Sequence, residues 1–423
     1  MKFQKTTLPN GIRLITVPVA DHPSVTILVM AETGSSYEDK QTNGLSHFLE
    51  HMVFKGTPRR PQATLVSREL DSIGAQYNAF TSNEYTGYYA KVAPGKFDQA
   101  LDILADMYQH PLFQEDDIAK EKGVVVEEIR MYRDLPQRMA AYTFLELLYG
   151  DQPAGWMITG PEENVKSFTR DQLLSYKNSQ YVASSTVVII AGAFDEAMAP
   201  AQIEKAFASV PTTTKKDKPA VTQSQSTPAT KTYFKETDQT HLIIGVRSFG
   251  INDPRMPIAN VMACVLGQGM SSRLFAKMRD GLGICYYVGT DQDVYTDHGT
   301  FEISAGVDNS RVKEAIQGIL EECNRLRNEP VPADELKKAK DIIASRTLLN
   351  LETSDARGEF CAYQEIVKGK IESPDEIIAK IQAVTSEQVQ ALARELFVDE
   401  KLNMAIVGKF KDSSAFKEYF KFS

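Results

Sequence analysis

Apolar residues follow two different spacings along the first half of the chain. Short apolar runs bounded by Gly, Pro or Asn predict strands, and apolar residues at three- and four-residue steps predict amphipathic helices. The strands are expected at 12–17, 25–30, 76–80, 86–92 and 186–191, the first after the hairpin signal Leu8-Pro9-Asn10-Gly11. The helices are expected at 45–52, 62–73, 97–107, 115–132, 137–148, 170–180 and 198–208.

The second half repeats this order of elements. Strands are expected at 241–246, 286–289, 300–305 and 402–407, and helices at 257–266, 333–351 and 413–422. A further amphipathic helix is marked by Val312, Ala315, Ile316 and Ile319, which repeat the spacing of Phe97, Ala100, Leu101 and Leu104. The repeat predicts an internal duplication. The expected fold is α+β, with two homologous α/β domains, each a mostly antiparallel sheet covered by helices.

The length and one polar segment set the expected domain boundaries. A chain of 423 residues exceeds what one hydrophobic core normally holds. The segment from Pro211 to Lys231 has few apolar residues and is typical of an exposed linker. We therefore expect domains at 1–210 and 231–423, joined by a linker at 211–230.

Composition and charge exclude several classes of protein. The net charge of −9 argues against a nucleic-acid-binding protein. The segment Met1–Leu8 lacks the apolar run of a signal peptide, and no stretch approaches the length of a membrane helix. The four cysteines form no Cys-x-x-Cys pair, which favours free thiols in a reducing compartment. We expect a cytoplasmic protein with no membrane partner.

His47, Glu50 and His51 form an inverted zinc motif, His-x-x-Glu-His, within the helix expected at 45–52. Residues four apart lie on one helical face, so both imidazoles can reach one metal ion. Glu50 lies beside them and can take a proton from a water molecule that the metal activates. Only six histidines occur in the chain, which makes a chance pair of surface histidines the weaker interpretation.

A catalytic zinc uses three protein ligands, so one more ligand must come from elsewhere in the chain. The candidate segment is 121–129, which carries Glu121, Glu127 and Glu128. When the two halves are aligned by eye, His47, Glu50 and His51 fall opposite Ser272, Phe275 and Ala276, within the segment 269–276. In the same alignment, Glu121 falls opposite Ala339, and Glu128 opposite Arg346. One copy thus keeps the metal-binding groups and the other lacks them.

These residues resemble the pitrilysin and insulinase family of zinc metallopeptidases. The chain is most similar to the two-domain branch, which includes bacterial peptidases and the β subunit of the mitochondrial processing peptidase. The resemblance covers essentially the whole chain. The matching strings are Gly44–Thr57, Gly74–Ser82, Tyr88–Lys91, Glu121–Tyr132 and Gly267–Val288.

The resemblance implies a role for each motif residue. His47, His51 and Glu128 would be the ligands of one Zn²⁺ per chain, and Glu50 the general base. Glu121 would hold the geometry of the ligands. Glu127 is the rival third ligand, and we prefer Glu128 because it shares a helical face with Glu121. The range 1–210 would then be the catalytic domain.

The same resemblance assigns substrate contacts to both halves. Arg279 and Tyr286 of the second domain match an arginine and a tyrosine that hold the substrate at the zinc. The alternative is that Tyr287 is exposed, that Tyr286 belongs to the core and that Arg279 forms a surface ion pair. The segment Asn78, Ala79, Phe80, Thr81 is similar to the family's edge strand, with which an extended peptide pairs.

The expected function is that of a zinc endopeptidase that hydrolyses short or unfolded peptides. The family's chamber is built from four such domains, which implies a homodimer of this two-domain chain. Two alternatives stay open at this stage. The chain could be a non-catalytic scaffold or assembly subunit, or the catalytic half of a heterodimeric processing peptidase.

Overall fold

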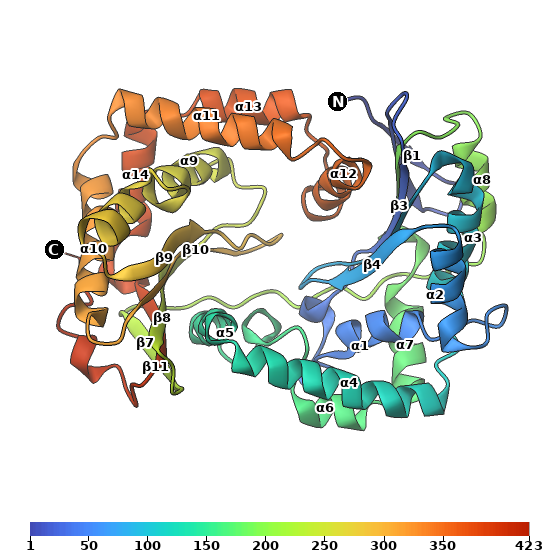
Figure 1. Ribbon diagram of the computed structural model, residues 1–423, viewed down its shortest axis with the longest axis horizontal. Coiled ribbons are helices and arrows are strands. Elements are labelled where there is room, and N and C mark those ends of the chain that lie inside the picture. Colours follow the sequence, from blue (N-terminus) through green and yellow to red (C-terminus); the bar gives the residue numbers. More distant parts are fainter. Residues whose placement is uncertain (423) are drawn as a thin grey trace. The chain divides into compact units, whose positions relative to one another are not determined.

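The computed structural model of the protein describes residues 1–422 and divides into two compact units (Figure 1). Unit 1 comprises Met1–Arg130, Trp156–Pro219 and Leu349–Ile371. Unit 2 comprises Met131–Gly155, Ala220–Leu348 and the chain from Glu372 onward. Each unit is therefore built from three separate stretches of sequence.

Unit 1 is built on a six-stranded sheet within the described chain, with the strand order β1-β2-β6-β3-β5-β4. The strands β2 and β6 are parallel, and the other neighbours are antiparallel. The central strands β3 and β6 are buried along their whole length, as expected when both faces of a sheet are covered. The bounds are β1 Gln4–Thr7, β2 Arg13–Pro18, β3 Val25–Ala31, β4 Gln76–Thr81, β5 Thr86–Val92 and β6 Thr186–Gly192.

Helices cover both faces of this sheet. One face, which includes Val188 and Ile190, belongs to a core shared with α1, α2, α3, α4, α7 and α8. The other face is covered by α12, where a Cβ at Gly358 would lie 3.5 Å from the side chains of Ile189 and Ala191. The bounds are α1 Leu45–Val53, α2 Ala63–Ser72, α3 Phe97–Gln109, α4 Glu115–Asp134, α6 Glu162–Ser167, α7 Arg170–Gln180, α8 Ala199–Ala206 and α12 Ser354–Lys368.

Unit 2 is built on a five-stranded sheet, again counted within residues 1–422, with the order β7-β11-β8-β10-β9. The pair β7 and β11 is parallel, and the remaining pairs are antiparallel. The strands are β7 Ala229–Phe234, β8 Gln239–Ser248, β9 Cys285–Asp291, β10 Gly299–Asp308 and β11 Asn403–Gly408. The helices are α5 Pro136–Tyr149, α9 Met256–Gly267, α10 Val312–Asn328, α11 Ala333–Leu349, α13 Pro374–Gln382 and α14 Ser386–Leu396, with a π-helix at Phe275–Gly281.

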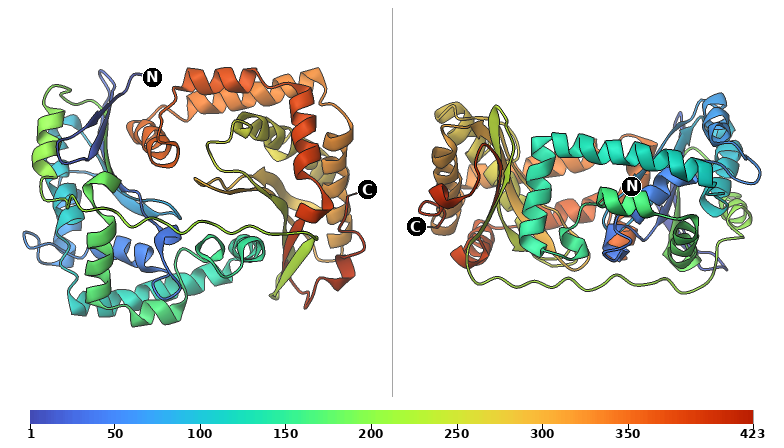
Figure 2. Two further views of the ribbon diagram at one scale, coloured as in Figure 1. Left: turned by 180° about the vertical axis from the view of Figure 1, so that it is seen from behind. Right: turned by 90° about the horizontal axis from the view of Figure 1, so that it is seen from below.

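The two sheets share one strand plan. The order β2-β6-β3-β5-β4 in unit 1 corresponds to β7-β11-β8-β10-β9 in unit 2, and the parallel pair occupies the same place in both. The expected α+β fold with two alike domains is thus confirmed. Figure 2 allows each sheet and its helices to be followed from two further sides.

The two units nevertheless differ from the continuous ranges 1–210 and 231–423 expected from the sequence. The reason is that the helix following α4 belongs to unit 2, and the helix following α11 belongs to unit 1. The helix α5 follows α4 in the chain, yet its Phe144 packs with Ile243 and Val407 on the sheet of unit 2. The helix α12 follows α11, yet it packs on the sheet of unit 1. Hydrophobic periodicity identifies the apolar side of a helix, but it does not identify the sheet that this side covers.

The by-eye alignment of the two halves is wrong around the zinc motif. In chain order and in packing against the outer strand of the sheet, α9 occupies the place of α1, and the π-helix occupies that of α2. His47, Glu50 and His51 therefore do not correspond to Ser272, Phe275 and Ala276. The helix α9 is buried on nearly all sides, so its sequence lacks the amphipathic pattern that would have aligned it.

The last element also differs from its prediction. The helix expected at 413–422 is wrong, because the described chain has only a short 3₁₀ turn at Ser414–Phe416. Phe416, Phe420 and Phe422 still pack into the core of unit 2. The apolar spacing in this segment therefore arises because separate turns direct each Phe side chain into the core, not because the segment is one continuous helix.

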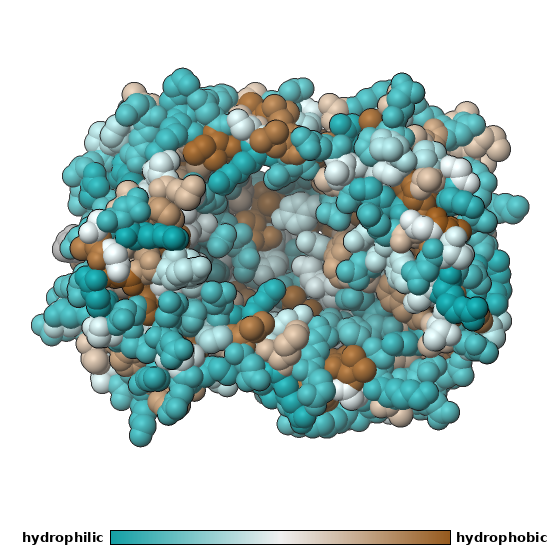
Figure 3. Space-filling model, in the orientation of Figure 1, coloured by the Kyte–Doolittle hydropathy of each residue, from teal (hydrophilic) through white to brown (hydrophobic). Residues whose placement is uncertain are grey.

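The surface agrees with the composition of the chain. Charged residues make up 24% of the sequence, and the face shown in Figure 3 is mostly hydrophilic with scattered apolar residues. Among residues 1–422, none of the helices is both long enough and apolar enough to cross a bilayer.

Candidate metal centre

The helix α1 carries the zinc motif, and its first turn is held by buried groups. Gly44 precedes the helix with φ +99°, and a Cβ there would lie 2.5 Å from the carbonyl oxygen of Thr159. The buried carboxylate of Glu38 accepts hydrogen bonds from the N–H groups of Gly44, at 2.8 Å, and Ser46, at 2.6 Å. A carboxylate at a helix N-terminus satisfies the free N–H groups and complements the helix dipole. These contacts fix where α1 begins.

His47, His51 and Glu128 come together between α1 and α4. One possible ligand atom from each lies within 4.8 Å of the others, and in the described chain no other such group of metal-binding side chains is found. Glu128 lies 3.6 Å from His47 Nε2 and 3.4 Å from His51 Nε2. In a tetrahedral zinc site, neighbouring ligand atoms are about 3.4 Å apart. The two imidazoles and the carboxylate therefore fit a zinc ion.

Glu121 and Lys55 extend the site beyond these three side chains. Glu121 accepts a hydrogen bond from His51 Nδ1 at 2.9 Å, and its second oxygen lies 2.6 Å from Lys55 Nζ. Burial raises the pKa of Glu121, but the hydrogen bonds from His51 and Lys55 outweigh it and lower that pKa. Such an outer carboxylate fixes the orientation and tautomer of a metal-binding histidine. His47 differs, because its buried Nδ1 has no hydrogen-bond partner in residues 1–422.

The electrostatics of the site favour a cation. Although burial disfavours the charged imidazolium, hydrogen bonds with Glu121 and Glu128 and the charge of Glu50 raise the pKa of His51 to about 9. Three carboxylates thus surround two imidazoles. A group of this composition attracts either a proton or a divalent metal ion.

Glu50 lies on the same helix but makes a different contact. Its Oε2 accepts a hydrogen bond of 2.5 Å from the hydroxyl of Thr81 in β4. Within the described residues, the Glu50 carboxylate has no other hydrogen-bond or ion-pair partner. It is therefore available to a substrate or a water molecule beside the three clustered side chains.

Glu127 points away from this cluster. Its side chain is 70% exposed and pairs with Arg130 at 2.7 Å, one turn along α4. The preference for Glu128 over Glu127 therefore agrees with the geometry of α4, which turns Glu121 and Glu128 toward the histidines.

The segment Asn78–Thr81 lies in β4, which is the outermost strand of the sheet of unit 1. The strand pairs with β5 on one side, and no described strand pairs with its other side. The exposed side chain of Asn78 accepts a hydrogen bond from the N–H of Ala79 at 3.0 Å. Phe80 lies over Gly87 of β5, where a Cβ would collide with its ring. The edge position expected for this strand is present.

Arg279 and Tyr286 lie together in unit 2. Arg279 Nη1 donates to the carbonyl oxygen of Tyr286 at 2.9 Å, and the guanidinium lies 5.7 Å from the Tyr286 ring centre. Tyr286 is 71% exposed, whereas the hydroxyl of Tyr287 forms a hydrogen bond of 3.0 Å with His241 Nδ1. The alternative with Tyr287 exposed and Tyr286 in the core is therefore wrong.

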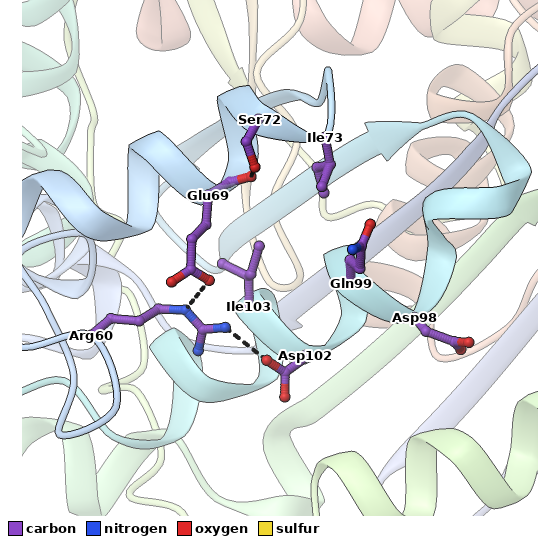
Figure 4. A pocket seen from close by; sticks show the side chains of 8 residues that line it. All are labelled: Arg60, Glu69, Ser72, Ile73, Asp98, Gln99, Asp102 and Ile103. Carbon is purple, nitrogen blue, oxygen red and sulfur yellow. Dashed lines mark hydrogen bonds and ion pairs between the residues drawn. The ribbon is translucent and has the colours of Figure 1, made fainter.

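A cavity of about 380 Å³ in unit 1 lies beside Arg60 on the loop after α1 (Figure 4). The guanidinium pairs with Glu69 of α2 at 2.8 Å and with Asp102 and Asp106 of α3 at 2.7 Å and 2.5 Å. The charge of Arg60 is thus neutralised by the carboxylates around it. We interpret this group as a partly buried network that ties the loop after α1 to α2 and α3.

Sequence reasoning missed Glu38, Lys55 and Arg60, and it missed the contact of Thr81 with Glu50. The partners of Glu38, Arg60 and Thr81 lie at spacings that no periodic pattern reveals. Lys55 alone had a signal, because it lies one helical turn beyond His51 within the matching string Gly44–Thr57.

Comparisons with known proteins agree with this geometry. Residues 14–162 match a sequence family described as insulinase (peptidase family M16), and residues 167–343 match one described as the peptidase M16 inactive domain. The uncharacterized zinc protease YmxG of Bacillus subtilis is 35% identical over 94% of this chain and 96% of its own length. An uncharacterized zinc protease of Streptomyces coelicolor is 30% identical over 97% of this chain and 91% of its own length.

Solved structures share the fold. A protease from Helicobacter pylori aligns with a TM-score of 0.88 and 21% identity, over 96% of this chain and 99% of that one. A Pseudomonas fluorescens protein described as a peptidase M16 inactive domain aligns with a TM-score of 0.89 and 18% identity, over 97% and 98%. A chain of complex III₂ from Candida albicans aligns with a TM-score of 0.83 and 17% identity, over 98% of both chains. The sequence matches along nearly the whole chain show that it belongs to the insulinase family of peptidases, M16.

Proposed function

We propose that this protein is a zinc-dependent endopeptidase that hydrolyses short or unfolded peptides. The observation that carries the proposal is the meeting of His47, His51 and Glu128, with the carboxylate of Glu50 beside them. Relatives named zinc proteases that match nearly the whole chain support the same conclusion.

His47, His51 and Glu128 would hold one zinc ion per chain. When bound, zinc lowers the pKa of a water molecule toward neutrality and polarises the carbonyl of the peptide bond. Glu121 keeps the His51 ring oriented by accepting a hydrogen bond from its Nδ1–H, and Lys55 keeps Glu121 charged.

Glu50 acts as the general base and then as the general acid. Its carboxylate accepts a proton from the attacking water, and it then gives that proton to the nitrogen of the leaving amine. The hydroxyl of Tyr286 is proposed to donate to the oxyanion that forms on the carbonyl. Arg279 is proposed to hold the substrate backbone, and its bond to the Tyr286 carbonyl supports a joint role.

The substrate is proposed to bind as an added strand at the open edge of β4. Main-chain hydrogen bonds to Asn78–Thr81 would give affinity with little dependence on sequence. We further propose that two copies of the chain pair to form an enclosed chamber, which would admit only short or unfolded peptides. Sedimentation of the purified protein as a two-chain particle would support this part.

We also propose a cytoplasmic location, which the absence of disulfides among the four cysteines supports.

The test of the proposed function is Glu50→Gln. The variant keeps all three metal-binding side chains, so it should bind zinc as the wild type does. It removes the base, so hydrolysis of a quenched fluorescent peptide should fall by about 10²-fold or more. Zinc is measured by atomic spectroscopy on the same sample. Cleavage by this variant at the wild-type rate would refute the assignment of the base.

Metal analysis separates the enzyme from the non-catalytic scaffold. The enzyme should contain one zinc per chain and should lose activity to a chelator, whereas a scaffold would be metal-free and would lose no stability on chelation. Activity of the chain purified alone would exclude a heterodimer that needs a second subunit.

A further inference from the structure

The alternation of backbone groups along β4 identifies which residues face its open edge. Ser82 N–H donates to the Tyr85 carbonyl at 2.8 Å, and Thr81 is paired with Thr86. In an antiparallel ladder, bonded and non-bonded pairs alternate. The pair Thr81 and Thr86 is therefore non-bonded, and the N–H and C=O of Thr81 point away from β5, toward the open edge.

The side-chain bond at Ala79 agrees with this register. Ala79 lies two residues before Thr81, so its N–H also points toward the open edge, and there it donates to the Asn78 side chain. The edge groups that an added strand would use thus belong to Ala79 and Thr81. Thr81 is the last of them within β4.

The side chain of Thr81 makes a second connection. Its hydroxyl donates to Glu50 Oε2 at 2.5 Å, within the range of a charge-assisted O–H···O⁻ bond. Threonine is branched at Cβ, so the direction of its hydroxyl depends closely on the direction of its backbone. One residue therefore joins the open edge of the sheet to the carboxylate of Glu50.

We propose that Thr81 is a positioning residue that couples the pairing of a substrate at β4 to the orientation of the general base. An added strand fixes the Thr81 backbone, the backbone fixes the hydroxyl, and the hydroxyl holds one oxygen of Glu50. The other oxygen is then directed at the reacting water. This inference rests on the proposed function and deepens it, because it assigns to the edge strand a part in the chemical step.

The experiment compares three variants of Thr81 in the full-length, zinc-loaded protein. Thr81→Val has nearly the same shape but cannot donate a hydrogen bond. Thr81→Ser keeps the hydroxyl and loses only the methyl group. Thr81→Ala is a second variant without a hydroxyl, in case Thr81→Val does not fold. Thermal unfolding and zinc content are measured for each, and kcat and KM are measured on one quenched peptide.

The expected result is a fall in kcat of about tenfold or more for Thr81→Val and Thr81→Ala, a part of the 10²–10⁴-fold effect of a general base. We expect KM to change by less than about twofold, and Thr81→Ser to keep kcat within about threefold of the wild type. If Thr81 had only a structural role, Thr81→Val and Thr81→Ala would instead lower the thermal unfolding temperature or the zinc content along with kcat.

Three results would overturn the inference. The first is a kcat of Thr81→Val equal to that of the wild type. The second is a fall in kcat of Thr81→Ser as large as that of Thr81→Val. The third is a rise in KM of Thr81→Val with an unchanged kcat. In each case an active wild type and an inactive Glu50→Gln would leave the proposed function standing, whereas an inactive wild type would remove the proposed function itself.

Discussion

The carboxylate of Glu121 offers a quantitative test of how the metal site is built. Glu121→Gln keeps the size of the side chain but removes its charge. The hydrogen bond from His51 Nδ1 then becomes a neutral one, and the ion pair with Lys55 is lost. Because Glu121 is not one of the three clustered side chains, we expect the variant to bind zinc more weakly rather than not at all.

The size of the effect follows from the 2.9 Å bond between His51 and Glu121. A hydrogen bond to a charged group contributes about 1.5–3 kcal/mol, and a neutral one about 0.5–1.5 kcal/mol. The variant should therefore lose about 1–2 kcal/mol of zinc-binding free energy. Solvent screens little of this contribution because the Glu121 side chain is buried. Since about 1.4 kcal/mol is a factor of ten, the zinc Kd should rise by about 5- to 30-fold.

The assay is a titration of the metal-free protein with zinc against a chromogenic chelator of known affinity. Glu127→Gln is the matched control, because it makes the same change on the same helix at an exposed carboxylate that pairs with Arg130. We expect the control to bind zinc as the wild type does. A Kd for Glu121→Gln within twofold of the wild type would refute the reasoning, and so would an equal rise in the control.

Three other substitutions test features of the two units. Gly44→Ala places a Cβ at φ +99° and 2.5 Å from the Thr159 carbonyl oxygen. It should therefore destabilise the protein by about 2–4 kcal/mol and lower the urea midpoint of the metal-free form. An unchanged midpoint would contradict the close approach of Gly44 to Thr159. Tyr286→Phe removes only an exposed hydroxyl, so it should lower kcat by about 10²-fold at constant stability, as loss of an oxyanion donor does. Tyr287→Phe should instead cost about 1 kcal/mol of stability through its lost bond to His241, and equal kinetic effects in the two variants would contradict the assignment.

The parts of the site that sequence reasoning located are those fixed by one helix. His47, Glu50 and His51 lie on α1, where a four-residue step is enough to bring side chains together. Glu128 lies on a second helix, where the family resemblance implied it and its two-turn spacing from Glu121 favoured it over Glu127. Glu38 could not be found in this way, because its role depends on a loop that folds back to the start of α1.

The fold shows the same division between local and distant information. Strands β3, β5 and β6 were predicted within about one residue, since short apolar runs are local signals. The helix α9 was misaligned because nearly all of its sides are buried, which removes the amphipathic period. The residues Phe144 of α5 and Gly358 of α12 reach their sheets through contacts that the sequence order does not indicate.

The helix α5 packs in unit 2, and α12 packs in unit 1. This arrangement limits the order in which the two units can fold during synthesis. Unit 1 needs Leu349–Ile371, so a ribosome must add most of the second half before the first sheet gains its cover over Ile189 and Ala191. Until then the nascent chain presents an uncovered apolar sheet face, which a chaperone or a neighbouring nascent chain could bind. The two halves mature together, although the genetic message specifies them one after the other.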